Sequence, residues 1–292
     1  LDYFNVGVGV DPATHFPYDN INSSNMADTY TQPTLIGFYL QILGDVVNGS
    51  INNGMTRSQA LGEINTVLTN LLSVQSAYGW NGLLPWLNLS PLGALSNEVA
   101  LGDNANLAQS IAVTIGALEA TNLSGSDLTL AQQIATKADQ FLDNQAVGYA
   151  AFVDPGLGVF YGSVNSSNGV FNPDYHIDRL ANEFRGAVAF LKVRYPSLPD
   201  TVWSGLQVVT ANYTDRNGEV IGNLANWDGS AFQIFWPMLR NDERDFIGFR
   251  NALYNQLVTQ LDYAYQNNIP GILSASLRPE NGYYGCIGIP QI

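Results

Sequence analysis

The feature that most constrains this chain is a series of long segments in which apolar residues recur every three to four positions. Loops rich in glycine, proline, asparagine and aromatic residues separate them. This spacing is the period of an α-helix and puts the apolar side chains of each segment on one face. The clearest cases are residues 33–47, which begin with Pro33, and the segment that opens at Thr56 with Gln59 in capping-box spacing. The sequence therefore predicts a mainly helical protein.

The same pattern, with flanking caps and prolines, predicts helix in several further segments. These are residues 103–118, 128–144, 178–194, a short stretch around Trp203, 230–239 and 242–267. Residues 148–172 alternate around Pro155 and predict an accessory β-hairpin. Long connections fit a closed ring of helical hairpins better than a four-helix bundle, whose connections are usually short. Since no linker-like stretch divides the sequence, we expect residues 1–292 to form a single domain.

The composition narrows the classes of partner. Of the 292 residues, 25 are acidic and 11 are Lys or Arg, so the net charge is −14. A negative chain repels phosphate groups, and we therefore expect neither nucleic acid nor an anionic membrane surface as a partner. No stretch approaches the ~20 consecutive apolar residues that a membrane-spanning helix needs. One cysteine and two histidines leave almost no ligands for zinc, so we expect no metal and no cofactor.

Two features bear on localisation. The chain contains six Asn-x-Ser/Thr sequons, which are Asn22, Asn48, Asn88, Asn122, Asn165 and Asn212. It begins with Leu1 instead of Met, which suits a mature chain after signal removal or a fragment of a longer one. Sequons are used only where glycosylation operates, so they favour a secreted or periplasmic protein only weakly.

The residues that could carry chemistry are carboxylates. The sequence lacks the phosphate-binding loop, the nucleophile elbow and the H-E-x-x-H zinc motif. It therefore has none of these motifs that usually indicate nucleotide binding, acyl transfer or zinc catalysis. Carboxylates instead stand among aromatic, amide and small residues. This composition is expected where sugar rings stack on aromatic faces and their hydroxyl groups meet Asn, Gln, Asp and Arg. Carbohydrate is therefore the natural ligand class.

Two segments pair a carboxylate with a helix start. In the first, Asp103 stands at the predicted start of a helix, where the dipole and free N–H groups stabilise its charge. The alternative is an ordinary N-cap. In the second, residues 226–237 gather two Trp and two Phe around Asp228. Here a pocket wall and a core helix capped by Asp228 are equally good interpretations.

A third segment is denser in polar residues. If it is helical, Asp178, Asn182 and Arg185 recur along one face. Arg179 and Glu183 stand one turn apart on another. Such spacing fits a functional face, and the alternative is a solvated helix with two ion pairs.

Together, five ordered motifs resemble the glycoamylase-like domain family, which includes endo-β-1,2-glucanases and the transglycosylating domain of cyclic β-1,2-glucan synthases. The motifs are YTQPTLIGFYL (30–40), GDNANL (102–107), IDRLANEFR (177–185), WDGSAF (227–232), and GYYG (282–285) followed by GIP (288–290). The resemblance covers nearly the whole chain. It implies an (α/α)6 toroid and, where the domain is hydrolytic, inverting cleavage of a glycan, plausibly a β-1,2-linked glucan.

Inverting cleavage needs a protonated acid and a carboxylate base about 6.5–9.5 Å apart. The resemblance assigns the acid to Glu183 and leaves Asp103 and Asp228 as candidates for the base or for binding hydroxyl groups. Burial against a neighbouring Phe would raise the pKa of Glu183, whereas Arg179 and Arg185 would lower it. The candidate substrate-binding residues are Trp80, Trp86, Asn106, Tyr161, Asp178, Arg179, Trp227 and Tyr284. For each aromatic residue in this set, packing in the core is the alternative.

The chain departs from the family pattern at its end. The resemblance implies several more helices beyond Gly288, whereas this sequence ends at Ile292. We therefore expect a fragment, a ring completed by another polypeptide, or the loss of the last hairpins. Two alternatives to a hydrolase stay open: a non-catalytic carbohydrate-binding or structural protein on the same scaffold, and a polysaccharide lyase using Tyr175 and His176.

Overall fold

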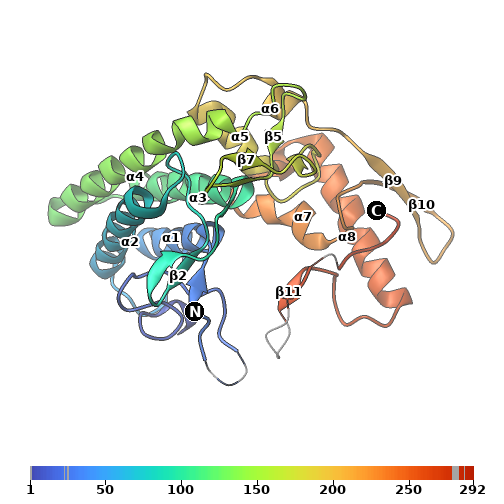
Figure 1. Cartoon of the computed structure of the whole chain (residues 1–292). Coiled ribbons are helices and arrows are strands. Elements are labelled where there is room, and N and C mark those ends of the chain that lie inside the picture. Colours follow the sequence, from blue (N-terminus) through green and yellow to red (C-terminus); the bar gives the residue numbers. More distant parts are fainter. Residues whose placement is uncertain (1, 23, 25, 278–282, 286) are drawn as a thin grey trace.

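A computed structural model describes residues 2–22, 24, 26–277, 283–285 and 287–292, and it is mainly helical (Figure 1). The α-helices of this part of the chain are α1 (Pro33–Asn48), α2 (Arg57–Tyr78), α3 (Leu101–Glu119), α4 (Gly125–Ala151), α5 (Arg185–Arg194), α6 (Thr201–Ser204), α7 (Ala231–Phe235) and α8 (Ile247–Gln266). Three 3-10 turns accompany them: η1 (Asp2–Phe4), η2 (Trp236–Leu239) and η3 (Glu243–Asp245). In Figure 1 the helices follow an arch, with α2 and α4 at one end and α8 at the other.

The first half of the arch is a double layer of helices. Helix α1 packs against α2 and α3, and α4 packs against α2 and α3. Helices α1 and α3 approach closely because Gly37 has no side chain, and a Cβ there would lie 2.9 Å from the Cβ of Ser110. Both predicted ends of α1 and the predicted start of α2 are confirmed. Helix α1 begins at Pro33 and is followed by Gly49, which is in the left-handed conformation, and Thr56 forms the capping box of α2.

The hydrophobic core includes this double layer and extends to the N-terminal segment, β5 and α5. Its largest fully buried apolar side chains are Tyr39, Tyr149, Phe16, Phe141, Phe152 and Phe160. Two smaller clusters lie around α7 and α8 and around the β9–β10 hairpin. The part of the chain that the structure describes contains no helix that is long and apolar enough to cross a membrane.

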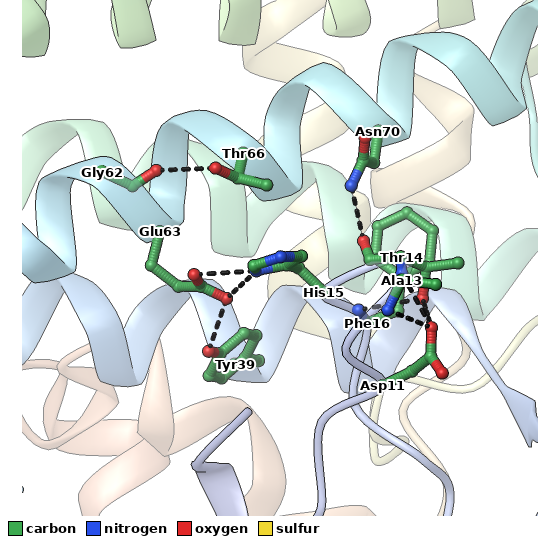
Figure 2. A network of polar contacts seen from close by, with 10 residues as sticks. All are labelled: Asp11, Ala13, Thr14, His15, Phe16, Tyr39, Gly62, Glu63, Thr66 and Asn70. Atoms are coloured by element: carbon green, nitrogen blue, oxygen red, sulfur yellow. Dashed lines mark hydrogen bonds and ion pairs between the residues drawn. The ribbon is translucent and has the colours of Figure 1, made fainter. Parts of the chain in front are cut away.

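Residues 11–16 of the N-terminal segment contact α1 and α2 through a network of hydrogen bonds (Figure 2). The Nδ1 atom of His15 lies 2.8 and 2.9 Å from the two carboxylate oxygens of Glu63, which also accepts a 3.0 Å hydrogen bond from the hydroxyl of Tyr39. The side-chain amide of Asn70 donates to the backbone carbonyl of Thr14. These contacts position the segment that leads into the first strand.

The strands are short and antiparallel. They are β1 (Tyr30–Thr31), β2 (Leu87–Leu89), β3 (Leu92–Ala94), β4 (Glu98–Ala100), β5 (Phe160–Tyr161), β6 (Ser163–Asn165), β7 (Val170–Phe171), β8 (His176–Ile177), β9 (Thr210–Thr214), β10 (Val220–Leu224), β11 (Ser276–Leu277) and β12 (Tyr283–Tyr284). The sheet orders are β1-β2-β3 and β4-β6-β7, and β5-β8, β9-β10 and β11-β12 form pairs. Around Pro155, a bridge between Val153 and Phe160 closes a turn, and β6 and β7 form a hairpin within the predicted range.

The prediction of a helix over residues 178–194 is wrong in its first part, because α5 begins only at Arg185. Residues 178–180 instead pair with Gln207, since Leu180 donates its N–H to the carbonyl of Gln207 and Gln207 donates to the carbonyl of Asp178, and residues 181–184 form a bend and a turn. Arg179 donates to the backbone carbonyl of Asn226 instead of facing Glu183. The helical spacing of the polar residues is therefore not realised, and neither ion pair of the solvated-helix alternative forms.

Two other helix predictions needed adjustment. The segment predicted over 230–239 is α7 followed by the 3-10 turn η2, because Pro237 has no N–H to continue an α-helix. The helix predicted over 242–267 begins at Ile247, after η3. The β9–β10 hairpin was not predicted, although Asn217-Gly218 at its turn is a strong hairpin signal.

Candidate active site

A cavity of about 680 Å³ opens between the N-terminal segment, the starts of α1 and α3, the turn before α5 and α7 with η2. Among the described residues, its lining combines three carboxylates with six aromatic rings and includes no lysine or arginine. The residues are Asp19, Tyr30, Gln32, Thr34, Leu35, Phe38, Trp86, Asp103, Asn106, Glu183, Phe184, Phe232, Trp236 and Ala275. Four of the candidates from the sequence, Trp86, Asp103, Asn106 and Glu183, meet here.

Glu183 stands in the turn before α5, and its Oε2 atom is buried with no hydrogen-bond partner among the described residues. Burial, together with the negative charges of Asp228 and Asp103, raises the pKa of this carboxyl group to about 7. A backbone hydrogen bond and the charge of Arg185 oppose these effects without reversing them. The group therefore holds its proton near neutral pH.

The turn that carries Glu183 is held from both sides. On one side, Arg185 is fully buried and donates to both carboxylate oxygens of Glu243, at 2.8 and 2.6 Å. It also donates to the backbone carbonyls of Asn182, Gln233 and Ile234. On the other side, the ring of Phe184 lies where a side chain on Gly102 would be, since a Cβ there would come within 2.3 Å of the ring. The direction of the Glu183 side chain is thus fixed by packing.

Asp103 lies in the first turn of α3, but it does not cap the helix. The N-cap position is Ala100, so the N-cap interpretation of Asp103 is wrong. Its two oxygens each accept one hydrogen bond of 2.7 Å, from the hydroxyl of Thr34 and from the indole N–H of Trp86. Burial raises the pKa of Asp103, and these two hydrogen bonds lower it in part. The carboxylate faces the cavity with both oxygens engaged.

The sequence-based search missed the carboxylate of Asp19 and its partners. Asp19 accepts hydrogen bonds from the hydroxyl of Tyr30 at 3.0 Å and from the amide of Gln32 at 2.7 Å. The ring of Tyr30 stacks on Trp86, with centroids 5.9 Å apart and planes within 4°. Burial, followed by the charge of Asp19, raises the pKa of Tyr30. The one available signal was that Tyr30 and Gln32 belong to the motif over residues 30–40.

Three buried polar atoms in the cavity wall lack a partner within the described part of the chain. They are Oε2 of Glu183, Oδ1 of Asn106 and Nε1 of Trp236. An unpaired buried polar atom costs about 1–3 kcal/mol. Together these atoms comprise an amide acceptor, an indole donor and a carboxyl oxygen, a combination that a ligand with several hydroxyl groups satisfies.

Asp228 lies just before α7 and is not part of the cavity lining. Its Oδ1 accepts a 2.9 Å hydrogen bond from the backbone N–H of Ser230, the N-cap residue of α7. Its charge nevertheless contributes to the raised pKa of Glu183. Asp228 therefore supports the start of α7 and acts electrostatically on the cavity.

Three aromatic candidates pack away from the cavity lining. Trp80 meets the rings of Phe152 and Phe171 edge-on. Tyr161 stacks on Phe171, with centroids 4.9 Å apart, and Trp227 meets Tyr175 edge-on. All three are partly buried against the core.

The other predicted substrate-binding residues also lie apart from the cavity lining or outside the description. Arg179 binds the carbonyl of Asn226, and Asp178 pairs through its backbone with Gln207. Tyr284 belongs to β12, and its side chain falls outside the described part of the structure.

The Tyr175–His176 pair of the lyase alternative does not reach the cavity lining. The Nε2 atom of His176 lies 2.9 Å from the carboxylate of Asp154. The described residues also contain no group of three or more His, Cys, Asp or Glu side chains that could hold a metal ion.

The fold around this cavity is similar to the helical toroids of several solved structures. The endo-β-1,2-glucanase from Talaromyces funiculosus in complex with sophorose has a TM-score of 0.82 at 18% identity, over 99% of this chain and 67% of that one. A Glu-to-Gln mutant of that glucanase with β-1,2-glucan has a TM-score of 0.82 at 18% identity, and the match covers 98% of this chain and 65% of that one. The endo-β-1,2-glucanase from Chitinophaga pinensis with sophorotriose and glucose has a TM-score of 0.68 at 15% identity, and the match covers 99% of this chain and 72% of that one.

These likenesses confirm, at the level of the fold, the resemblance read from the five motifs. The chain spans about two thirds of the length of the Talaromyces glucanase. No protein-family model matches the chain, and no curated protein is significantly similar to it in sequence.

Proposed function

We propose that the cavity is the active site of a glycoside hydrolase that cleaves a β-glucan, with Glu183 as the general acid. The observation that carries the proposal is a cavity carboxyl group with a pKa raised to about 7 and one unpaired buried oxygen. A general acid must be protonated at the working pH and must have a free oxygen to reach the substrate. Among the carboxylates that line the cavity, Asp19 and Asp103 have both oxygens engaged by the protein.

The proposed reaction is inverting hydrolysis. The Glu183 carboxyl proton passes to the glycosidic oxygen as the bond from that oxygen to the anomeric carbon breaks. A water molecule attacks the opposite face of the anomeric carbon and gives its proton to a carboxylate base, which leaves a hemiacetal of inverted configuration. Asp103 and Asp228 are the candidate bases in this chain. The two hydrogen bonds on Asp103 favour a hydroxyl-binding role for that residue instead.

The proposed substrate is a neutral glucan, plausibly β-1,2-linked. The cavity offers aromatic faces on which sugar rings stack, and its described lining residues include no cationic side chain that would recognise an acidic sugar. Two of the similar solved structures are of an endo-β-1,2-glucanase in complex with sophorose or β-1,2-glucan, which supports the linkage. Their identity of 18% makes the linkage the first property to test.

The test is incubation of the chain with β-1,2-glucan and with β-1,3-, β-1,4- and α-linked glucans, followed by NMR of the products. We expect release of β-1,2-linked oligosaccharides whose new reducing ends are first α. Glu183→Gln should abolish the release, and Asp178→Asn, a change away from the cavity lining, should not. Absence of products from every glucan, or unchanged activity of Glu183→Gln, would reject the proposal.

A substrate with a good leaving group separates the roles of the carboxylates. An aryl glycoside needs little acid assistance, so Glu183→Gln should retain more of its activity on that substrate than on the glucan. The variant that lacks the base should lose activity on both substrates. The activities of Asp103→Asn and Asp228→Asn on the aryl glycoside and on the glucan are compared in the same way. Azide, which replaces water as the nucleophile, should restore activity to whichever variant lacks the base.

A carbohydrate-binding protein without turnover is the second candidate. One observation favours it: both oxygens of Asp103 are engaged by hydrogen bonds from the protein. In that case Glu183→Gln should bind glucans with undiminished affinity, and no reducing ends should form with either protein.

We further propose that the helices belong to an (α/α)6 toroid formed by one domain and that the protein is secreted or periplasmic. Exposure of the sequon residues Asn48, Asn122, Asn165 and Asn212 is compatible with glycosylation in such a compartment. Mass spectrometry of the protein from its native source, before and after glycosidase treatment, tests the localisation.

A further inference from the structure

A second hollow lies on the three-stranded sheet β4-β6-β7 and shares no lining residue with the cavity around Glu183. Its volume is about 330 Å³, and its polar lining residues are Glu98, Ser163, Asn165, Asn168 and Asn172. In the sheet, Asn165 pairs directly with Glu98 of β4 on one side and with Val170 of β7 on the other. Side chains of directly paired residues lie on the same face, about 5 Å apart. We call this hollow the β6 groove, and Asn165 stands in it between a carboxylate and an apolar side chain.

Asn165 is also the first residue of the sequon Asn165-Ser166-Ser167. Its Oδ1 atom accepts hydrogen bonds from the backbone N–H and the hydroxyl of Ser167, at 3.0 and 2.6 Å. Its Nδ2 atom, to which a glycan would be attached, has no acceptor among the described residues, and the side chain is exposed. The turn between β6 and β7 therefore uses the amide oxygen and leaves the nitrogen available.

The other five sequons lack this combination in the part of the chain that the structure describes. The side-chain nitrogens of Asn48 and Asn88 each donate a hydrogen bond within the protein, at 3.2 and 3.0 Å. Asn22 is half-buried, and its residue does not line either hollow. Asn122 and Asn212 are exposed, but neither lines the β6 groove or the cavity. Only Asn165 joins an available nitrogen to a hollow beside it.

The β6 groove offers the contacts that an N-acetylated sugar makes. The side-chain oxygens of Asn168 and Asn172 accept hydrogen bonds from the backbone N–H groups of Val170 and Asp174, at 2.9 and 3.1 Å, which leaves their NH2 groups as donors. The exposed carboxylate of Glu98 can accept hydrogen bonds from sugar hydroxyl groups. Val170 is 60% exposed and provides an apolar surface for the methyl of an acetyl group. The groove thus combines donors, an acceptor and an apolar contact.

We infer that Asn165 is N-glycosylated and that the first sugar of its glycan, an N-acetylhexosamine, lies in the β6 groove. In the transfer, the side-chain nitrogen of Asn165 bonds to the anomeric carbon of an oligosaccharide that is carried by a lipid diphosphate. The bond from that carbon to the diphosphate oxygen breaks, the lipid diphosphate leaves, and the amide nitrogen gives up one proton. The inference rests on the proposal that the protein is secreted, because sequons are used only where glycosylation operates.

The place of the groove gives the sugar a structural role. Strand β4 ends at Ala100, and α3 begins at the next residue, Leu101, whose N–H donates to the carbonyl of Gly162 beside β6. Asp103 of the cavity lies in the first turn of this helix. A sugar that contacts both β4 and β7 would connect the outer strands of the sheet from which α3 starts. We therefore expect the sugar to stabilise the folded chain.

The first test measures occupancy. The chain is produced behind a secretion signal in a eukaryotic host, so it passes through a glycosylating compartment whatever its natural destination. Endoglycosidase H then leaves one sugar on each occupied asparagine, and mass spectrometry of the peptides locates it. We expect the sugar on Asn165 in nearly every molecule and less often on Asn48 and Asn88. The result is separate from the localisation proposal, which protein from the native source decides, and from glucan hydrolysis, which is measured on unglycosylated chain.

The second test asks whether the sugar lies in the groove. Thermal unfolding is compared between the trimmed wild type and Asn165→Gln, and the sugar should raise Tm by about 2 °C, the effect of roughly one hydrogen bond in a chain of this size. Glu98→Gln combined with Val170→Ala should remove most of this difference while the sugar stays attached. The matched control is Asn122→Gln, which changes an exposed sequon away from both hollows and should leave Tm unchanged.

Nuclear Overhauser contacts give a direct readout of the same position. We expect them between the acetyl methyl of the sugar on Asn165 and the methyl groups of Val170. If Asn165→Gln is not secreted in folded form, wild-type chain from which a peptide-N-glycosidase has removed the whole glycan replaces it.

Two results would overturn the inference. An unmodified Asn165 in the secreted chain, whether or not other sequons carry sugars, would reject the modification. Equal Tm values with and without the sugar, together with no Overhauser contact to Val170, would show that the glycan extends into solvent and that the groove does not bind it.

Discussion

The guanidinium group of Arg185 and the carboxylate of Glu243 form a buried two-point ion pair, with N–O distances of 2.8 and 2.6 Å. Arg185 opens α5, and Glu243 lies in η3, so the pair joins the turn that carries Glu183 to the segment before α8. Its remaining donors bind backbone carbonyls, which leaves the arginine fully paired in a site without solvent. The position of the proposed catalytic acid therefore depends on a contact 58 residues away in the sequence.

Removing one partner of this pair should strongly destabilise the protein. In Glu243→Gln the guanidinium stays buried without a counter-charge, and we expect a loss of about 3–5 kcal/mol in the free energy of unfolding. Urea unfolding followed by circular dichroism measures it. The neighbouring pair Asp242–Arg244 is exposed, so Asp242→Asn should leave the unfolding midpoint unchanged. Equal effects of the two substitutions would contradict the buried pairing.

The raised pKa of Glu183 should appear in the pH dependence of stability. The carboxyl group has a pKa of about 7 in the folded chain against a reference value of 4.5, so the folded state holds this proton more tightly than the unfolded state. Its contribution to stability is therefore greatest below pH 4.5 and is lost as the pH rises to about 7. Relative to Glu183→Gln, the wild type should lose about 3 kcal/mol across this window.

Comparing the two proteins isolates this one group from the other carboxylates. Unfolding free energies are measured in urea at half-unit steps from pH 4 to 8. A difference between wild type and Glu183→Gln that does not change with pH would show that the carboxyl group titrates normally.

The close contact between Gly102 and Phe184 predicts a packing effect on the site. A Cβ at position 102 would lie 2.3 Å from the Phe184 ring, so Gly102→Ala must displace the ring beside Glu183. Overpacking of this kind costs about 1–3 kcal/mol. We also expect a lower kcat on the glucan that proves to be the substrate, because the ring lines the cavity.

Another glycine of the same helix provides the control. Gly116 has open space around it, so Gly116→Ala should stabilise α3 by about 0.5–1 kcal/mol without affecting the site. Adding Phe184→Leu to Gly102→Ala should restore part of the stability, because the smaller side chain makes room for the methyl group. If Gly102→Ala behaves like Gly116→Ala, the contact is not as close as described.

The long helices could be predicted from the sequence because their signals are local. Pro33 at the start of α1, Gly49 after its end and the Thr56–Gln59 capping box each act within a few residues. The start of α5 could not be predicted in this way. Residues 178–184 have helical spacing, but backbone hydrogen bonds between residues 178–180 and Gln207 prevent a helix there, and no local pattern indicates a partner that far along the chain.

The candidate site was predictable only in part, for the same reason. Glu183 and Asp103 were found through motifs that stand in order along the sequence, whereas Trp86 was one of several aromatic candidates outside these motifs. Asp19 was missed because its place in the cavity comes from tertiary contacts: it binds Tyr30, which stacks on Trp86, and the indole of Trp86 donates to Asp103. Trp80 belongs to the same aromatic class as Trp86, and only the packing of the folded chain distinguishes the two positions.

The network of Figure 2 predicts a link between the N-terminal segment and the cavity. The Glu63 carboxylate joins three segments, because it binds His15 and the hydroxyl of the buried Tyr39 from its place on α2. Glu63→Gln keeps the size of the side chain but removes its charge and one acceptor, and we expect a loss of about 1–3 kcal/mol in unfolding free energy. The exposed Glu119→Gln on α3 should have no such effect.

The same substitution should also weaken ligand binding in the cavity. Asp19 lines the cavity and stands only four residues after His15. Limited proteolysis should cleave Glu63→Gln within residues 2–29 faster than wild type, because the segment opens locally before the rest of the protein. Isothermal titration with sophorose should then show weaker binding in Glu63→Gln than in Glu119→Gln. Unchanged proteolysis together with unchanged sophorose binding would show that the N-terminal segment is held independently of Glu63.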